Sequence, residues 1–335
     1  MNRKLRKIVV GVTVFLSLIT TGRTVEVDDE VIRLARGAFI DRMVSDHNFN
    51  REDLAEVLDS ASINQGVLEA ISRPAERVLT WHEYRQLFLS EARISAAVEF
   101  WSAHNEEIQE ASANYGVEPE LLLAILGIES FFGQRTGSYR VLDSLATLAF
   151  AYPPRSSFFA SELEAFFLLI REEGVEPHEL LGSYAGAMGA GQFISSSYRA
   201  YAVDGDGDGQ RDLWGSWQDI LGSIANYFKV HGWIEGAPVV DRATRPSSWS
   251  GSEPSNSMNL NDTVGSLAEM GYVFSTTLPE SSPATMLALD GQDGLEYWVG
   301  YHNFRVIPRY NRTVKYALAI HQLGQAIRMA TESRL

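Results

Sequence analysis

The chain has 335 residues, which is enough for two or three domains with a sizeable hydrophobic core. Its hydrophobic fraction of 45% and charged fraction of 21% are those of an ordinary globular protein, and the lack of cysteine excludes disulfides, thiol chemistry and thiolate metal sites. Residues 1–24 hold five basic residues and no acidic one, so the formal net charge of −15 becomes −20 for the remainder. Such an acidic body is expected to repel nucleic acid and anionic membranes, and to favour a neutral or cationic polymer or a metal ion as its partner.

The first 24 residues predict a signal peptide. Basic residues between positions 3 and 7 precede the apolar stretch 8–19, which is too short for a comfortable membrane span. Cleavage is expected near Thr24, with an uncleaved N-terminal anchor as the alternative, and a lipid anchor on cysteine is excluded. We therefore expect export to a bacterial periplasm.

Helical patterns dominate the segments that follow. Apolar residues recur at helical spacing through residues 27–110, and Asn50 resembles the start of a helix. We assign residues 25–105 to an N-terminal helical domain.

The richest motifs lie between residues 106 and 231, and the composition then changes. Residues 232–305 are rich in Gly, Pro and Ser with short β-prone runs, which predicts a small inserted β-rich domain. Helical spacing returns at 316–330, so a helical core is assigned to 106–231 together with 306–335. The expected fold class is mainly α (α+β).

Glu129 lies within an almost wholly apolar run, residues 121–132, which predicts a buried helix with Pro119 in its first turn. Burying an unpaired carboxylate is costly, so such a group tends to take up a proton, and a carboxyl that is neutral near pH 7 can act as a general acid. A structural role remains the alternative, either through a distant arginine or backbone group or on a narrow exposed stripe.

Residues 182–193 form a Gly/Ala-rich loop that ends in Gln192 and Phe193. Small residues allow close approach of a backbone to a ligand, and the Gln192 amide could hold a neutral polar substrate. The alternative is a tight structural turn between helices. No Gly-Lys-Ser/Thr follows, so this is not a phosphate loop.

Residues 204–212 match the first half of an EF-hand calcium loop. Position 12 of that pattern is Gly215, so a carboxylate from further along the chain has to complete the site. The expected ligands are Asp204, Asp206, Asp208, the carbonyl of Gln210, and Asp219. A solvated acidic turn is the alternative, but three carboxylates this close repel one another without a cation, which favours Ca²⁺.

Taken together, these segments resemble the membrane-bound lytic transglycosylase B family of peptidoglycan enzymes (glycoside hydrolase family 103). The resemblance runs from about Phe39 to Ile327 and rests on residues 115–120, 127–130, 142–148, 182–193, 213–214, 225–228 and 309–312.

The resemblance implies a lysozyme-like helical core with an N-terminal helical domain and a small inserted β domain. It places the family's single catalytic glutamate on Glu129 and its calcium loop on residues 204–219, with no organic cofactor. The substrate-cleft residues that it implies are Tyr84, Ser183, Met188, Gln192, Phe193, Tyr227, Tyr310, Asn311 and Tyr316.

The chain departs from the family pattern at three places. Ser195 replaces a proline after the Gln-Phe pair, which is expected to loosen that loop. The stretch from Trp214 to Asp219 is one residue longer, which weakens the assignment of Asp219 as a ligand. Ser130 and Phe131 stand where the family often has a threonine and a basic residue.

The implied reaction cleaves the β-1,4 bond between N-acetylmuramic acid and N-acetylglucosamine without water and leaves a 1,6-anhydro product. Asp143 is the nearest second carboxyl, but its apolar companions favour a capping or packing role. The expected partners are glycan strands and, beyond them, other cell-wall enzymes, with the protein itself a monomer. The alternatives are a hydrolytic muramidase, a non-catalytic peptidoglycan-binding protein and a calcium sensor.

Overall fold

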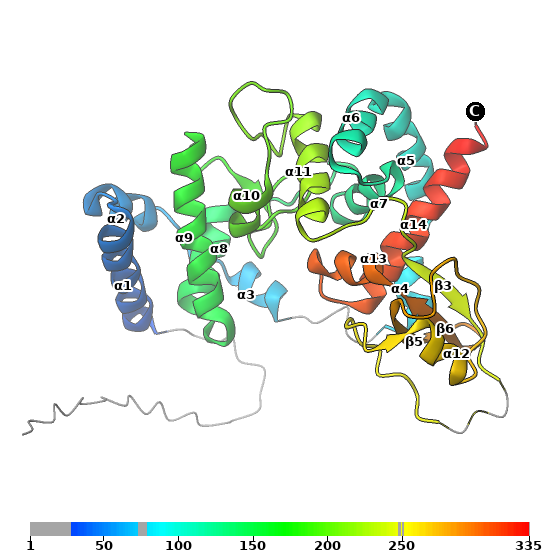
Figure 1. Cartoon of the computed structure of the whole chain (residues 1–335). Helices are drawn as coiled ribbons and strands as arrows, with labels where there is room; N and C mark the ends of the chain where they lie inside the picture. Colours follow the sequence, from blue (N-terminus) through cyan, green and yellow to red (C-terminus); the bar gives the residue numbers. More distant parts are fainter. Residues whose placement is uncertain (1–27, 73–78, 247–248, 250, 335) are drawn as a thin grey trace, which may run out of the picture.

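The structure, a computed structural model, describes residues 28–72, 79–246, 249 and 251–334. The predicted signal peptide lies outside these residues. Among the helices that the structure does describe, none combines the length and the apolar character needed to cross a membrane. The described part of the chain is mainly helical with a four-stranded and a two-stranded sheet, which confirms the predicted class (Figure 1).

Helices fill the N-terminal third, as the sequence predicts. They are α1 (Asp29–His47), α2 (Arg51–Asp59), α3 (Gln65–Ile71), α4 (Trp81–Gln86), α5 (Glu91–Ala103) and α6 (Asn105–Tyr115). Asn50 caps α2 by accepting from the backbone N–H groups of Glu52 and Asp53, so the predicted helix start is confirmed.

These helices divide their packing between two parts of the molecule. The first three contact one another or α8, whereas α5 packs on α7 and α14, and α6 packs on α11 (Figure 1). One hydrophobic cluster runs from Phe39 of α1 to Ile327 of α14. A domain boundary at residue 105 therefore stays a prediction.

Among the central helices, α7 (Pro119–Glu129) packs on α14 and α11 as well as on α5 and α6, and its residues Leu121 to Gly127 are all buried. The others are α8 (Val141–Ala151), α9 (Ser156–Glu173), α10 (Ser195–Tyr201), α11 (Trp217–Val230), α13 (His302–Val306) and α14 (Val314–Glu332), with short 3-10 turns η1 (Pro153–Arg155) and η2 (Ile307–Arg309). The closest helix partner of α7 is α14, and this pair carries the site described below.

The β-rich segment forms an antiparallel sheet of order β3-β6-β5-β4 with α12 (Val264–Glu269) beside it. Its strands are β3 (Val240–Ala243), β4 (Asp262–Thr263), β5 (Pro283–Gly291) and β6 (Gly294–Gly300). The sheet has its own hydrophobic cluster and contacts α4, where the Trp81 indole donates to Glu296 Oε2 (3.1 Å). A two-stranded pair, β1 (Tyr139–Arg140) and β2 (Leu181–Gly182), leads into the Gly/Ala-rich loop.

Candidate active site

Glu129 is the last residue of α7 and is half-buried, whereas the apolar turns before it are fully buried. The sequence predicts the buried helix correctly, but the carboxyl lies at the end of the helix and not in its middle. The negative end of the helix dipole disfavours a charged carboxylate there. Against this, the hydroxyl of Tyr316, in the first turn of α14, donates to Glu129 Oε1 (2.6 Å).

The chain after Glu129 turns sharply through three residues with positive φ: Phe131 (51°), Phe132 (58°) and Gly133 (77°). Such angles are costly for residues with side chains, so the surroundings must hold them. Ser130 Oγ accepts from the Gly133 N–H (2.9 Å), and the Phe132 N–H bonds the Leu126 carbonyl (3.1 Å). A Cβ on Gly133 would lie 2.9 Å from the Trp217 ring, so glycine is required.

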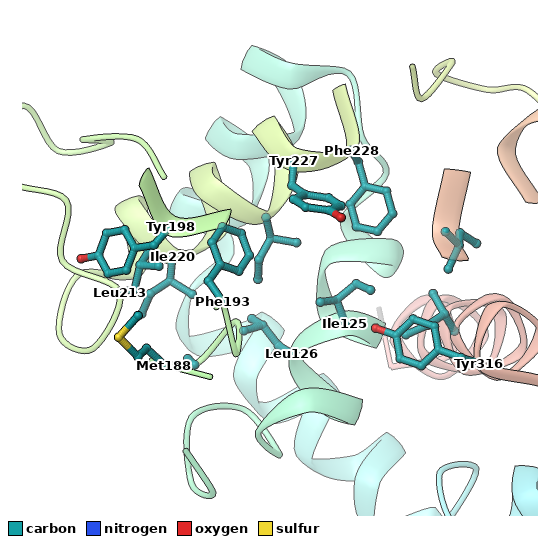
Figure 2. Packing of buried hydrophobic residues seen from close by; sticks show 14 of the residues in the cluster. Ile125, Leu126, Met188, Phe193, Tyr198, Leu213, Ile220, Tyr227, Phe228 and Tyr316 are labelled. Carbon is teal, nitrogen blue, oxygen red and sulfur yellow. The ribbon is translucent and has the colours of Figure 1, made fainter. Parts of the chain in front are cut away.

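A cluster of tyrosines lies next to this turn. The Tyr310 hydroxyl donates to the Gly191 carbonyl (2.6 Å), and the Tyr227 hydroxyl donates to the Arg309 carbonyl (2.5 Å). The two rings meet edge to face at 4.9 Å, and Phe193 lies 5.7 Å from Tyr310. Figure 2 shows Tyr227 on α11 with Phe193 below it, and the Tyr316 hydroxyl directed toward α7.

The environment keeps these phenols protonated. Burial, and after it the negative charge of Glu129, raises the pKa of Tyr310 and of Tyr316 well above the ordinary value of 10.0. Burial also raises the pKa of Tyr227 to about 12. All three are therefore hydrogen-bond donors at working pH and not bases.

The Gly/Ala-rich loop is folded on itself. The backbone N–H and carbonyl groups of Met188 and Phe193 bond each other (2.8 and 2.9 Å), and both side chains are buried. Ser183 Oγ accepts from the N–H groups of Ala185 (3.2 Å) and Ala187 (3.0 Å). Three of the predicted substrate residues therefore hold the loop in shape, in agreement with the alternative of a tight turn.

Gln192 has a backbone φ of 53°, and its Nε2 donates to the carbonyls of Thr136 (3.0 Å) and Gly189 (2.9 Å). Both amide hydrogens are thus directed at the protein. Gln192 can still offer its side-chain oxygen to a substrate.

The remaining predicted cleft residues are Tyr84 and Asn311. Tyr84 is 2% exposed in α4 and contributes to the raised pKa of Tyr316, which places it near that ring. Asn311 is half-buried in the turn before α14, where its main-chain oxygen accepts from the Thr313 N–H (2.8 Å). The structure thus brings Tyr84, Tyr310 and Tyr316 to Glu129, and the role of the Asn311 side chain stays a prediction.

The acidic loop gathers three carboxylates. Asp204, Asp206 and Asp219 each offer an oxygen within 4.8 Å of the others. Asp219 is fully buried and accepts from the N–H groups of Gly205 (2.7 Å) and Asp212 (2.6 Å), so the longer spacing does not remove it from the loop. Hard oxygen donors of this kind suit Ca²⁺.

Two further predicted ligands lie on the same loop outside that group. Asp208 Oδ1 accepts from the Gln210 N–H (2.8 Å). Their part in binding an ion stays a prediction.

Known proteins are similar to this chain in sequence and in fold. Residues 34–325 match the sequence model of the transglycosylase SLT domain. The chain belongs to this family. A curated relative, membrane-bound lytic murein transglycosylase B of Escherichia coli K12, is 40% identical over 303 residues, which cover 87% of this chain and 82% of the relative.

Three solved structures of lytic transglycosylases are similar to this chain. Catenated SltB1 from Pseudomonas aeruginosa is 46% identical with a TM-score of 0.84, over 88% of this chain and 97% of that one. An Escherichia coli lytic transglycosylase in complex with calcium is 39% identical with a TM-score of 0.80, over 89% and 94%. SltB3 from Pseudomonas aeruginosa in complex with NAG-anhNAM-pentapeptide is 30% identical with a TM-score of 0.78, over 89% and 80%. The protein is therefore a peptidoglycan-cleaving lytic transglycosylase.

Asp143 of the transglycosylase has a structural role. Its Oδ1 accepts from the Ser62 N–H (3.1 Å), and Arg140 lies 3.7 Å from its other oxygen. It holds the segment before α3 against α8, which agrees with the packing role predicted for it.

Glu162 is a buried carboxylate that the sequence analysis missed. It lies in the apolar helix α9, is 4% exposed, and accepts from the Ser196 N–H (2.9 Å) and hydroxyl (2.7 Å). The signal that draws attention to Glu129, an acid within an apolar helix, applies equally to Glu162. This signal alone does not separate a catalytic carboxyl from a structural one.

Proposed function

We propose that Glu129 is the single acid and base with which this transglycosylase cleaves the bond between N-acetylmuramic acid and N-acetylglucosamine. The observation that carries the proposal is the hydrogen bond from the Tyr316 hydroxyl to Glu129 Oε1 (2.6 Å). A tyrosine that stays protonated orients the carboxyl and stabilises the carboxylate that forms when the acid has given up its proton. The structural role that was the alternative for Glu129 is seen instead at Glu162 and Asp143, whose carboxylates accept from backbone N–H groups.

The reaction follows from one carboxyl that acts twice. Protonated Glu129 donates its proton to the oxygen of the β-1,4 bond as the bond from C1 to that oxygen breaks. The 2-acetamido group of the muramoyl sugar stabilises the cationic centre at C1. The Glu129 carboxylate then removes the proton of the C6 hydroxyl, whose oxygen attacks C1 and closes the 1,6-anhydro ring. Because the nucleophile belongs to the substrate, no water is consumed and no second carboxyl is needed.

Glycan strands lie along the residues around Glu129 in this proposal. The half-buried ring of Tyr310 faces the sugars, while the buried Tyr227 packs against it (4.9 Å) and the buried Tyr84 lies near Tyr316. The Gln192 oxygen and Asn311 bind N-acetyl or hydroxyl groups. Met188, Phe193 and Ser183 support the loop that carries Gln192. The SltB3 complex with an anhydro-sugar peptide supports this product class.

A structural calcium ion belongs in the acidic loop. Asp204, Asp206 and Asp219 would hold it, completed by Asp208 and the Gln210 carbonyl. The calcium complex of the Escherichia coli relative supports the assignment. The proposed single-carboxyl chemistry requires no organic cofactor. A murein substrate and the predicted leader support a periplasmic location. A monomeric state and contacts with other cell-wall enzymes stay predictions.

The test of Glu129 is its replacement by glutamine in an assay on purified peptidoglycan. We expect Glu129→Gln to lose at least about 10²-fold in rate, because the proton donor is removed while the shape is kept. Asp143→Asn is the matched control and should retain activity. A fully active Glu129→Gln variant would sink the assignment, and an inactive Asp143→Asn variant with an intact fold would require a second carboxyl.

A further inference from the structure

A buried guanidinium lies between the helices that carry Tyr84 and Glu129. Arg93 of α5 is 9% exposed, and it donates from Nε to the Gly127 carbonyl (2.9 Å) and from Nη1 to the Leu87 carbonyl (2.5 Å). Within the part of the chain that the structure describes, no carboxylate lies within ion-pair range of this side chain. A buried cation without a carboxylate needs another source of negative charge.

Both acceptors are at the carboxyl ends of helices. Gly127 lies in the last turn of α7, and Leu87 is the C-cap of α4. The last carbonyls of a helix lack intrahelical partners and carry the negative end of its dipole, about half an elementary charge. One planar guanidinium therefore satisfies two helix ends at once, which a lysine ammonium could do only in part.

Two aromatic rings continue these contacts toward the site. Phe88 and Phe131 lie 5.3 Å and 5.4 Å from the guanidinium carbon of Arg93. Phe88 is 5.2 Å from the Tyr84 ring, and Phe131 is the residue with φ of 51° just after Ser130. The guanidinium thus contacts both α4, which carries Tyr84, and the end of α7, which carries Glu129, through main-chain carbonyls and through aromatic rings.

We propose that Arg93 is a positioning residue for the transglycosylase reaction. By holding the carboxyl ends of α4 and α7 together, it sets the distance between Tyr84 and Glu129 and supports the strained turn after Glu129. The inference rests on the proposed role of Glu129. If it is correct, replacing Arg93 slows the chemical step even in enzyme that remains folded.

The experiment compares kcat and KM on soluble glycan strands for Arg93→Met, Arg93→Lys and Arg36→Met. Arg36 is the matched control, because it also donates to a main-chain carbonyl, Leu58 O (3.2 Å), and belongs to α1. We expect Arg93→Met to lower kcat by about 10²-fold with KM changed by less than about threefold, since a small displacement of a catalytic group has effects of this size. Arg93→Lys should restore part of kcat, and Arg36→Met should lower Tm without lowering kcat.

Equal kcat values for Arg93→Met and Arg36→Met, measured where both are folded, would overturn the proposal. If Arg93→Met does not fold, Arg93→Lys decides: a reduced kcat supports positioning, and a wild-type kcat contradicts it. The Glu129→Gln variant keeps the two proposals distinguishable. Its activity tests whether Glu129 is the acid, whereas the activity of the Arg93 variants tests whether Arg93 positions that acid.

Discussion

Tyr316 and Glu129 are 187 positions apart in the chain, and the tyrosine hydroxyl donates to the glutamate Oε1 at 2.6 Å. The contact joins the first turn of α14 to the last residue of α7. The Tyr316 ring is 1% exposed, and its raised pKa keeps the proton on the phenol. Tyr316 is thus a donor that keeps its proton, and Glu129 is an acceptor whose charge changes during the proposed reaction.

Replacing Tyr316 by phenylalanine should slow the enzyme by about 10- to 100-fold in kcat, because a hydrogen bond to a charged group contributes about 1.5–3 kcal/mol. The ring remains, so Tm should change little. The loss of a donor to the carboxylate should also move the alkaline limb of the kcat profile to higher pH. Tyr301→Phe is the control, since its hydroxyl donates to Oδ2 of Asp241 in strand β3 (2.8 Å). Equal kcat in the two variants would contradict the role of Tyr316.

The buried tyrosines predict a loss of stability at alkaline pH. Burial raises the pKa of Tyr227 to about 12 and those of Tyr310 and Tyr316 well above 10.0. Because the folded protein holds these protons more tightly than the unfolded chain, their contribution is fully present below about pH 10 and is lost as the pH rises through the folded pKa values. The free energy of unfolding, measured between about pH 8 and pH 12, should fall most steeply above pH 10. Titration of every tyrosine near pH 10 in the folded protein would argue against this account.

Ser195 offers a stabilising substitution. It is the first residue of α10, its hydroxyl is buried without a hydrogen-bond partner among the described residues, and Ile194 before it is extended (φ −73°, ψ 159°). Proline is favoured at the first position of a helix and requires an extended residue before it. Ser195→Pro should therefore raise the free energy of unfolding by about 0.4–1 kcal/mol.

The neighbouring residue is the control for this substitution. The Ser196 N–H bonds Glu162 Oε2 (2.9 Å), so Ser196→Pro should destabilise the protein. Denaturant titration measures both variants, and a less stable Ser195→Pro variant would show that the loop needs the freedom that serine gives it.

Calcium should raise Tm through the acidic loop. An ion at about 100 times its dissociation constant adds about 2.7 kcal/mol to stability if it binds only the folded state. Asp204→Ala together with Asp208→Ala should abolish the shift, and Asp219→Asn should do so as well, because Asp219 lies within 4.8 Å of its partners. The exposed Asp290→Asn is the control. A shift that persists in the loop variants would place the ion elsewhere.

The sequence predicts the elements that depend on local patterns. The run of apolar residues predicts α7, the side-chain chemistry of Asn50 predicts the helix cap, and the spacing of the aspartates predicts the acidic loop. The resemblance to the transglycosylase family adds the grouping of Tyr310 and Tyr316 with Glu129, which periodicity alone does not provide.

The contacts that the sequence does not predict join distant main-chain atoms. The Ala190 N–H bonds the Leu213 carbonyl (3.0 Å), and a Cβ on Gly189 would lie 2.3 Å from that oxygen. Arg93 likewise binds two carbonyl groups, which every residue carries. Because no side-chain type marks such acceptors, only the tertiary arrangement reveals them.

The central claim is that one carboxyl cleaves the glycan with the substrate's own hydroxyl as nucleophile. Mass spectrometry of the muropeptides that the mature enzyme releases from purified sacculi tests this most directly. We expect products that end in 1,6-anhydromuramic acid from the wild-type enzyme, and none of these products from the Glu129→Gln variant. Products with reducing ends that carry one added water would contradict it and would indicate a hydrolase that admits water beside Glu129.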